Sequence, residues 1–139
     1  MEPDGTTVEH EFQAEKTWHL RQRIEILSAP TPGKAKRLGR KATLREDWDE
    51  VRIDVMRGLV LRKFLDHPEL ANKLIATDEG GFGPQLLIEG NNWGDRFWGM
   101  TEGDEGSQWR WVGENNLGII LMEVRFELTV IKMAKEKAS

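Results

Sequence analysis

The sequence predicts a predominantly helical α+β domain that uses all of its 139 residues. Apolar residues recur every three or four positions over most of the chain, which is the period of an amphipathic helix. One short apolar run and a stretch rich in glycine and tryptophan interrupt this period. A chain of this length buries one hydrophobic core and has no room for a second, so we expect a single domain, residues 1–139.

Two helices are expected at the start of the chain. Apolar spacing predicts the first over about 8–27, with Thr6 and Glu9 at the separation of a capping box. A short helix over about 32–39 should follow, with Thr31 as its cap. Its lysine and arginine side chains make this helix basic in a chain that is acidic as a whole.

Two further helices are expected before a turn-rich segment. The longest should run from about 44 to 65, with Thr43 and Glu46 as a capping box at its start. A proline ends it and begins a short helix over 68–76. Turn-forming residues over 78–83 then break the helical pattern.

The last third of the chain changes character. One strand is expected over the short apolar run 84–89. Residues 90–114 lack a helical period and hold four of the six tryptophans, so we expect a long loop that forms the wall of a site. A final helix should begin at a cap formed by Asn115 or Asn116. Its apolar face should consist of Leu117, Ile120, Leu121, Val124, Leu128 and Ile131.

Composition excludes several classes of protein. Lysine and arginine total 20 against 24 aspartates and glutamates, which argues against a protein that holds nucleic acid chiefly by its phosphates. The chain has no cysteine, so disulfides, thiolate metal sites and cysteine nucleophiles are excluded. The sequence shows neither a signal peptide nor a membrane-spanning run, and we therefore expect a cytoplasmic protein with no membrane partner.

No metal ion or organic cofactor is expected. His10 and Glu11 do not continue into the H-E-x-x-H zinc motif, and His19 and His67 lack the spacing of metal ligands. The motifs G-x-x-x-x-G-K-[ST], G-x-G-x-x-G and G-x-S-x-G are also absent from the sequence. Kinase, dinucleotide oxidoreductase and serine hydrolase activities are therefore not expected.

Two blocks place a carboxylate among groups that stack on or hydrogen-bond a nucleotide. Residues 7–14 contain Glu9, and residues 92–99 contain Asp95 among glycine, arginine and aromatic side chains. Tyrosine is absent, so acid/base chemistry falls to carboxylates. Two carboxylates suit hydrolysis of a ribosyl C–N bond, because one can stabilise the oxocarbenium-like sugar while the other activates water or assists the leaving base.

These blocks, with others between them, resemble the NADAR (YbiA-like) superfamily of N-glycosidases. The matching blocks follow that family's order across nearly the whole chain, and they are Thr7 to Ala14, Gly33 to Arg40, Trp48 with Val51 to Met56, His67 to Leu70, Trp93 to Asp95, and Asn116 to Gly118 running into Leu121 to Arg125. The resemblance implies hydrolysis of the C–N bond between ribose phosphate and a pyrimidine-like riboflavin intermediate, or removal of ADP-ribose from guanine bases. It also implies that Glu9, Trp48 and Asp95 are required for catalysis.

Further residues are expected to bind the substrate. Gln13 lies one helical turn beyond Glu9 and is placed to bind the base or the sugar. Lys36 and Arg37 are expected to hold a phosphate, with Arg37 the strongest single candidate. The glycine-rich block supplies the remaining candidates, which are Asn92, Trp93, Gly94 and Phe97.

Each main candidate also has a purely structural interpretation. Glu9 has the spacing of a capping residue, Trp48 lies on an apolar stripe typical of a core residue, and Asp95 has neighbours typical of a turn or an arginine pair. The basic side chains over 34–40 are typical of a solvated helix face. Sequence pattern alone favours these interpretations, and the family resemblance reverses the order for Glu9 and Asp95.

The sequence thus predicts a metal-independent N-glycosidase. Its expected partner is a small nucleotide or an ADP-ribosylated base, with ADP-ribosylated nucleic acid as a further candidate. Family members usually carry an amino-terminal segment before the first block, and this chain is expected to lack it. Two alternatives therefore stay open: a non-catalytic module that binds ADP-ribose or a nucleotide, and a regulatory domain whose tryptophan loop contacts another protein.

Overall fold

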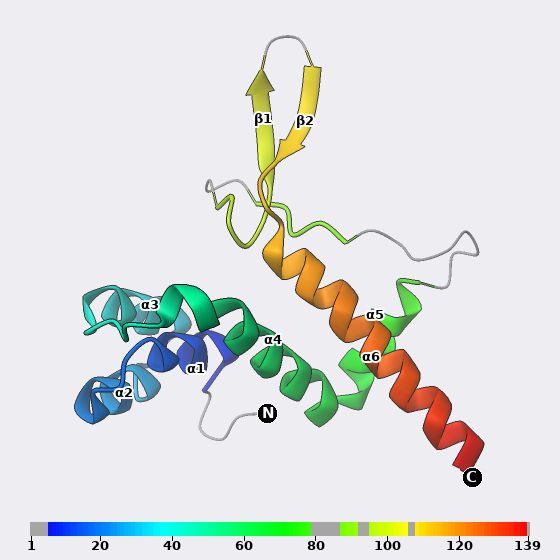
Figure 1. The fold of residues 1–139 in the computed structure, drawn as a ribbon, viewed down its shortest axis with the longest axis horizontal. Helices are drawn as coiled ribbons and strands as arrows, with labels where there is room; N and C mark the ends of the chain where they lie inside the picture. The colour runs from blue at the N-terminus through cyan, green and yellow to red at the C-terminus, as the bar shows by residue number, and fades with distance from the viewer. Residues whose placement is uncertain (1–5, 79–86, 92–94, 106–107, 139) are drawn as a thin grey trace. The chain divides into compact units, whose positions relative to one another are not determined.

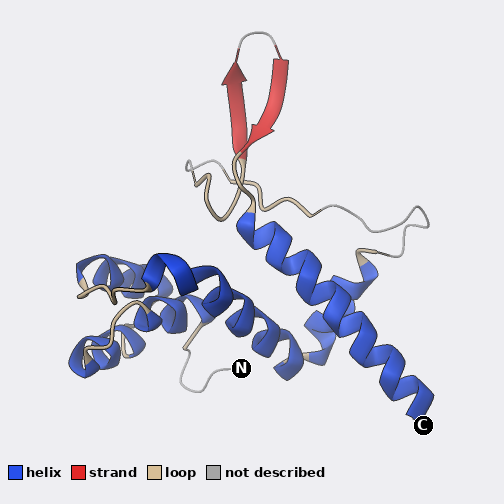
Figure 2. Cartoon of the chain, in the orientation of Figure 1, coloured by secondary structure: helices blue, strands red, loops and turns tan. Residues whose placement is uncertain are grey.

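The protein is described by a computed structural model that covers residues 6–78, 87–91, 95–105 and 108–138. Its contacts divide the chain into two compact units, Met1–His67 and Pro68–Ser139. The described residues form six α-helices and one two-stranded sheet, so the chain is predominantly helical, as predicted. Figure 1 labels these elements, and Figure 2 distinguishes helix from strand by colour.

Four helices form the first unit: α1 (Val8–Glu15), α2 (Leu20–Leu27), α3 (Pro32–Lys41) and α4 (Trp48–Asp66). Helix α1 contacts each of the other three, and α2 also packs against α3 (Figure 1). The core where α1, α2 and α3 meet consists of Ala14, Ile26 and Ala35, with Ala29, Leu38 and Ala42 packed against it. The small side chains in this core allow the three helices to approach closely.

The single helix predicted over 8–27 is two helices in the structure. Thr17, which lies between them, is fully buried, and its hydroxyl donates to Gln22 Oε1 at 3.2 Å. Arg23 Nη1 donates to the carbonyl oxygens of Ala14 and Thr17, each at 3.1 Å. These bonds supply partners for carbonyl groups at the end of α1. The break therefore depends on polar side chains that the apolar period does not reveal.

The helices predicted over about 32–39 and over 68–76 are confirmed as α3 and α5 (Pro68–Ala76). Helix α3 begins at Pro32, and the Thr31 hydroxyl accepts a hydrogen bond from the Lys34 backbone N–H at 3.1 Å. The helix continues to Lys41, slightly beyond its predicted end.

Helix α4 begins at Trp48, later than predicted, and the predicted Thr43 cap is wrong. The Thr43 backbone N–H donates to Gln22 Oε1 at 2.7 Å, and the Thr43 hydroxyl accepts from Gln22 Nε2 at 3.2 Å. Asp47 precedes α4, and its carboxylate accepts from Arg45 Nε at 2.6 Å. Thr43 therefore links the chain to α2 instead of starting α4.

In the second unit, α5 packs against α6 (Asn116–Ala138). The buried side chains of α5 are Ala71 and Leu74, and those on the predicted apolar face of α6 are Ile120, Val124 and Leu128. The other predicted members of this face, Leu117, Leu121 and Ile131, are half-buried. None of the helices in the described ranges is both long enough and apolar enough to cross a membrane.

Arg125 is a buried charge in α6, with only 2 % of its surface exposed. Its Nη1 donates to Thr77 Oγ1 at 2.8 Å, and its Nε lies 3.4 Å from Asp78 Oδ2. A buried guanidinium is tolerated only when it is paired and hydrogen-bonded. These contacts therefore join the residues that follow α5 to the middle of α6.

The strand predicted over 84–89 is not confirmed. Residues 84–86 lie outside the described residues, and 87–89 form no strand. Gly90, the next residue, forms an isolated bridge with Met100.

The loop predicted over 90–114 contains a hairpin. Strand β1 (Thr101–Glu105) pairs antiparallel with β2 (Gln108–Val112), with Thr101 opposite Val112 (Figure 1). The sequence of β2, Gln-Trp-Arg-Trp-Val, alternates in the period of a strand. The sequence of β1, Thr-Glu-Gly-Asp-Glu, is rich in residues that disfavour strands, so the pattern alone does not predict the hairpin.

Asn115 joins residues 87–89 to the start of α6. Its backbone is left-handed, with φ of 56°, a conformation that asparagine tolerates. Its Nδ2 donates to the Leu87 carbonyl and its Oδ1 accepts from the Glu89 N–H, each at 2.8 Å. A Cβ at Gly118 would overlap both the Asn115 amide and the Leu87 carbonyl oxygen. Glycine is therefore needed at this point of α6.

Gly118→Ala is expected to destabilise the protein, although alanine is the better helix former, because the added methyl group overlaps the Asn115 amide. Gly58→Ala in α4 is the matched control, since a Cβ at Gly58 meets no atom within 4 Å. Alanine there should stabilise the protein by about 0.5–1 kcal/mol. Urea unfolding of both variants measures the two changes, and equal stabilisation would contradict the close approach at Gly118.

Candidate active site

Thr7 and His10 hold the start of α1. The Thr7 hydroxyl accepts from the His10 backbone N–H at 3.3 Å, and the Thr7 backbone N–H donates to His10 Nδ1 at 3.1 Å. Because Nδ1 accepts this bond, the ring proton is assigned to Nε2, which donates to the Ala29 carbonyl oxygen at 2.9 Å. Thr7 and His10 therefore form the capping box, and the capping interpretation of Glu9 is wrong.

The Glu9 carboxylate pairs instead with an amide one helical turn along α1. Gln13 Nε2 donates to Glu9 Oε1 at 2.8 Å. Gln13 is 3 % exposed, whereas Glu9 is half-buried. The structure thus brings the predicted catalytic carboxylate together with one predicted binding residue, as their spacing of four residues predicts.

Lys16 lies near the same carboxylate, although it is absent from the predicted set. Burial lowers the pKa of Lys16, the Glu9 carboxylate raises it, and the positive charges of Lys36 and Arg40 lower it; the net pKa is below its usual value. Helix α3 therefore brings two basic side chains towards Lys16, at the C-terminal end of α1. The spacing of Glu9, Gln13 and Lys16 places them on one helical face, and this is the sequence signal that identifies Lys16.

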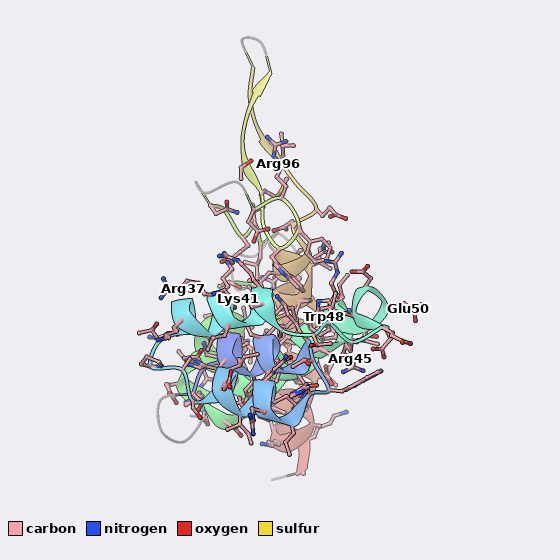
Figure 3. All side chains as sticks on the ribbon, turned by 90° about the vertical axis from the view of Figure 1, so that its left-hand side faces the viewer. Arg37, Lys41, Arg45, Trp48, Glu50 and Arg96 are labelled. Atoms are coloured by element: carbon pink, nitrogen blue, oxygen red, sulfur yellow. The ribbon has the colours of Figure 1, made fainter. Side chains whose placement is uncertain are left out.

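The predicted phosphate-binding residues lie on α3. Lys36, Arg37 and Arg40 are all exposed. Figure 3 shows Arg37 and Lys41 along α3, and Trp48 where α4 begins. Successive residues of a helix point about 100° apart, so Lys36 and Arg37 face different directions. Lys36 and Arg40 are the two whose positive charges act on Lys16, which shares a helical face with Glu9.

Trp48 is a core residue by its contacts. It is 5 % exposed, and its ring lies 5.0 Å from the Phe12 ring, tilted by 54°. Phe12 is equally buried and belongs to α1. The indole therefore joins the start of α4 to the helix that carries Glu9. This geometry agrees with the structural interpretation of Trp48, and its catalytic requirement stays a prediction.

Asp95 belongs to the second unit, where its carboxylate organises a turn. Its Oδ1 accepts from the backbone N–H groups of Phe97 and Trp98, each at 3.0 Å. Asn91 closes the same turn, because its Oδ1 accepts from the Asp95 N–H at 3.0 Å and its Nδ2 donates to the Asp95 carbonyl at 2.8 Å. The structural interpretation of Asp95 as a turn residue is thus correct, and its catalytic role stays a prediction.

The other predicted binding residues of the glycine-rich block are only partly described. Phe97 is half-buried, and its ring meets the Trp98 ring edge to face at 4.8 Å. Asn92, Trp93 and Gly94 lie outside the described residues.

The described residues offer basic groups for an anion but no cluster for a metal ion. Within the ranges given above, no three His, Asp or Glu side chains lie close enough to share a metal ion. Lys36 and Arg40 together carry two positive charges near Lys16. Such a group suits a phosphate better than a cation.

Trp48→Ala is expected to lower the free energy of unfolding by about 3–5 kcal/mol, because the buried indole leaves a cavity against Phe12. Trp48→Phe retains an aromatic ring and should cost clearly less. Urea unfolding of both variants gives the two values. A Trp48→Ala variant of unchanged stability that has lost ligand binding would show instead that Trp48 acts mainly on the ligand.

The pKa of Lys16 is expected to follow the charges of its neighbours. Glu9→Gln should lower it further, and Lys36→Gln should raise it, because each variant removes one neighbouring charge. Reductive methylation with ¹³C-formaldehyde followed by an NMR titration measures this pKa. Lys63→Gln in α4 is the control and should leave it unchanged. A Lys16 pKa that is the same in the wild type, Glu9→Gln and Lys36→Gln would contradict the described arrangement of α1 and α3.

Comparison with known proteins places the chain in a family. The sequence matches the NADAR domain over residues 4–129. It is 39 % identical over 127 residues to the N-glycosidase Npun_R5314 of Nostoc punctiforme, a match that covers 88 % of this chain and 73 % of that protein. It is 38 % identical over 128 residues to the N-glycosidase YbiA of Escherichia coli, covering 91 % and 72 %.

Two further matches extend this comparison. A riboflavin biosynthesis protein of Vibrio vulnificus is 37 % identical over 122 residues, which are 86 % of this chain and 30 % of that protein. The fold is similar to the NMR structure of E. coli YbiA, with a TM-score of 0.74 and 37 % identity over 94 % of this chain and 73 % of that one. Sequence and fold agree, and the chain belongs to the NADAR domain family.

Proposed function

We propose that this chain is a hydrolase that cleaves the N-glycosidic bond of a ribosyl nucleotide. Its family supports the proposal, because relatives that match most of the chain are named N-glycosidases. The similarity to a riboflavin biosynthesis protein favours a ribosylaminopyrimidine phosphate as the substrate. An ADP-ribosylated guanine, free or in nucleic acid, is the second candidate.

The observation that carries the proposal is the setting of Glu9. His10 takes the capping role, and Gln13 holds the Glu9 carboxylate on a half-buried part of α1. As the ribosyl C–N bond breaks, C1′ gains positive charge, which a fixed carboxylate stabilises. Water then adds its oxygen to C1′, and its proton goes to the departing nitrogen. The products are the free base and the sugar phosphate.

Basic residues of α3 are proposed to bind the phosphate of this substrate. The positive charges of Lys36 and Arg40 act on Lys16, which shares a helical face with Glu9, and Arg37 lies between Lys36 and Arg40 in sequence. Charge-assisted hydrogen bonds to phosphate oxygens are among the strongest that side chains make. A phosphate held at α3 would place the attached ribose towards Glu9.

The remaining predicted residues keep their roles as proposals. Asp95 is proposed to activate water or to assist the departing base, and Trp48, whose ring packs on Phe12 of α1, is proposed to be required for catalysis. The proposed steps use neither a metal ion nor an organic cofactor. The proposed contacts to the base come from Asn92, Trp93, Gly94 and Phe97.

Incubation with ribosylaminopyrimidine phosphate, and separately with ADP-ribosylated guanosine, should release free base, as measured by chromatography of the products. Glu9→Gln should lower turnover by roughly two or more orders of magnitude. Glu50→Gln is the matched control, because Glu50 is exposed and also lies in the first turn of a helix (Figure 3). It loses the same favourable interaction with the helix dipole and should keep full turnover.

Asp95→Asn tests the second carboxylate while retaining an oxygen that can accept from Phe97 and Trp98. Turnover should fall with little change in stability. Full activity of both the Glu9→Gln and Asp95→Asn variants would remove the catalytic assignment. Binding of ADP-ribose or nucleotide without release of base would favour the non-catalytic module, and no binding at all would favour the protein-interaction domain.

A further inference from the structure

Gln13 is a buried polar side chain, with only 3 % of its surface exposed. Its Nε2 already donates to Glu9 Oε1 at 2.8 Å. Its Oε1 is buried and accepts no hydrogen bond from any residue that the structure describes. A buried oxygen without a partner costs folding free energy, so its presence calls for an explanation.

Gly39 of α3 explains where the amide lies. A Cβ built on Gly39 would overlap Gln13 Oε1 and would lie 2.9 Å from Gln13 Cδ and 3.1 Å from Gln13 Cβ. Gly39 is buried and lies within the last turns of α3, where glycine is a poor helix former. The missing side chain at Gly39 therefore provides the space that the Gln13 amide occupies.

The chemistry of the amide then fixes its direction. If the amide were reversed, Oε1 would face the Glu9 carboxylate, and two acceptors would meet without a proton between them. Only the observed direction gives Glu9 a donor. In this direction, with its oxygen in the space beside Gly39, the amide donates to one Glu9 oxygen.

We propose that Gln13 is a positioning residue, which holds the Glu9 carboxylate in its reactive orientation within a space provided by Gly39. This role rests on the proposed N-glycosidase function and replaces the substrate contact that the sequence predicts for Gln13. A carboxylate that is only half-buried samples several rotamers, and a hydrogen bond from a packed amide selects one of them. Small displacements of a reacting group can lower turnover by about 100-fold.

The first test is a pair of glutamine variants in the full chain. Gln13→Met keeps the length of the side chain and removes both polar atoms, so it should fold at least as stably as the wild type. Its kcat should fall about ten- to one-hundredfold, while KM stays within about twofold, because Glu9 loses its donor but the substrate loses no contact.

Gln22→Met is the matched control, because the Gln22 amide bonds Thr17 and Thr43 and serves only to connect helices. It should lower stability and leave kcat unchanged in the folded protein. A raised KM with unchanged kcat in Gln13→Met would show that Gln13 binds the substrate and would overturn the positioning role.

The second test separates the space at Gly39 from the activity. Gly39→Ala should lower both stability and kcat, because the methyl group displaces the Gln13 amide. Adding Gln13→Ala to this variant vacates the space and should restore stability, whereas kcat should stay low. Recovery of kcat together with stability would show that Gly39 and Gln13 act only through folding.

A readout that does not require turnover completes the design. The Gln13 side-chain N–H resonances should shift in Glu9→Gln and stay unchanged in Glu50→Gln, as measured by ¹H–¹⁵N NMR. Unshifted resonances in Glu9→Gln would overturn the contact itself. If the wild type releases no base from either substrate, the proposed function fails and the positioning role fails with it. If the wild type turns over and Gln13→Met changes only KM, the positioning role alone fails.

Discussion

The hydrogen bonds of one imidazole, that of His10, hold α1 in place within the first unit. His10 Nδ1 accepts at the start of α1, while Nε2 donates to Ala29 in the segment that leads into α3. Helix α1 touches all three other helices of the unit, so anchoring its first turn also fixes the helices around it. Because Thr7 and His10 form the capping box, Glu9 makes no capping hydrogen bond. One ring therefore supports the packing and determines which carboxylate is available for chemistry.

Local signals determine which elements the sequence can predict. Thr31 with a following proline marks α3, a proline marks α5, and the apolar spacing of α6 identifies its buried face. The break after α1 could not be predicted in the same way, because it depends on Arg23 and Gln22 reaching back to bond the α1 end and Thr17. The predicted start of α4 is wrong for the same reason, because Thr43 bonds a glutamine in α2 and does not cap α4. Hydrogen bonds between residues that are distant in sequence produce no periodic pattern from which they could be predicted.

In the candidate site, too, contacts between neighbours in sequence are predictable and contacts between distant residues are not. The pair formed by Glu9 and Gln13 is predictable from its helical spacing, whereas the catalytic role proposed for Glu9 comes from the family resemblance. The influence of Lys36 and Arg40 on Lys16 requires α3 to lie against α1, and sequence spacing does not supply that contact. Asp95 forms the turn that its neighbours in sequence predict, and it is also a candidate catalytic carboxylate. Its Oδ1 accepts two backbone hydrogen bonds in a turn of the second unit, and these bonds fix the position of the carboxylate.

The shortness of α1 has a consequence for how activity is lost. Helices α1 and α2 have eight residues each, and isolated helices shorter than about 12–15 residues are marginal in water. The setting of Glu9 therefore exists only while the surrounding helices hold α1 in place. A folded molecule carries the complete arrangement, and a locally opened one carries none of it. Substitutions that only destabilise this unit then lower the number of competent molecules, whereas substitutions at Glu9 or at its partner Gln13 lower the turnover of each folded molecule.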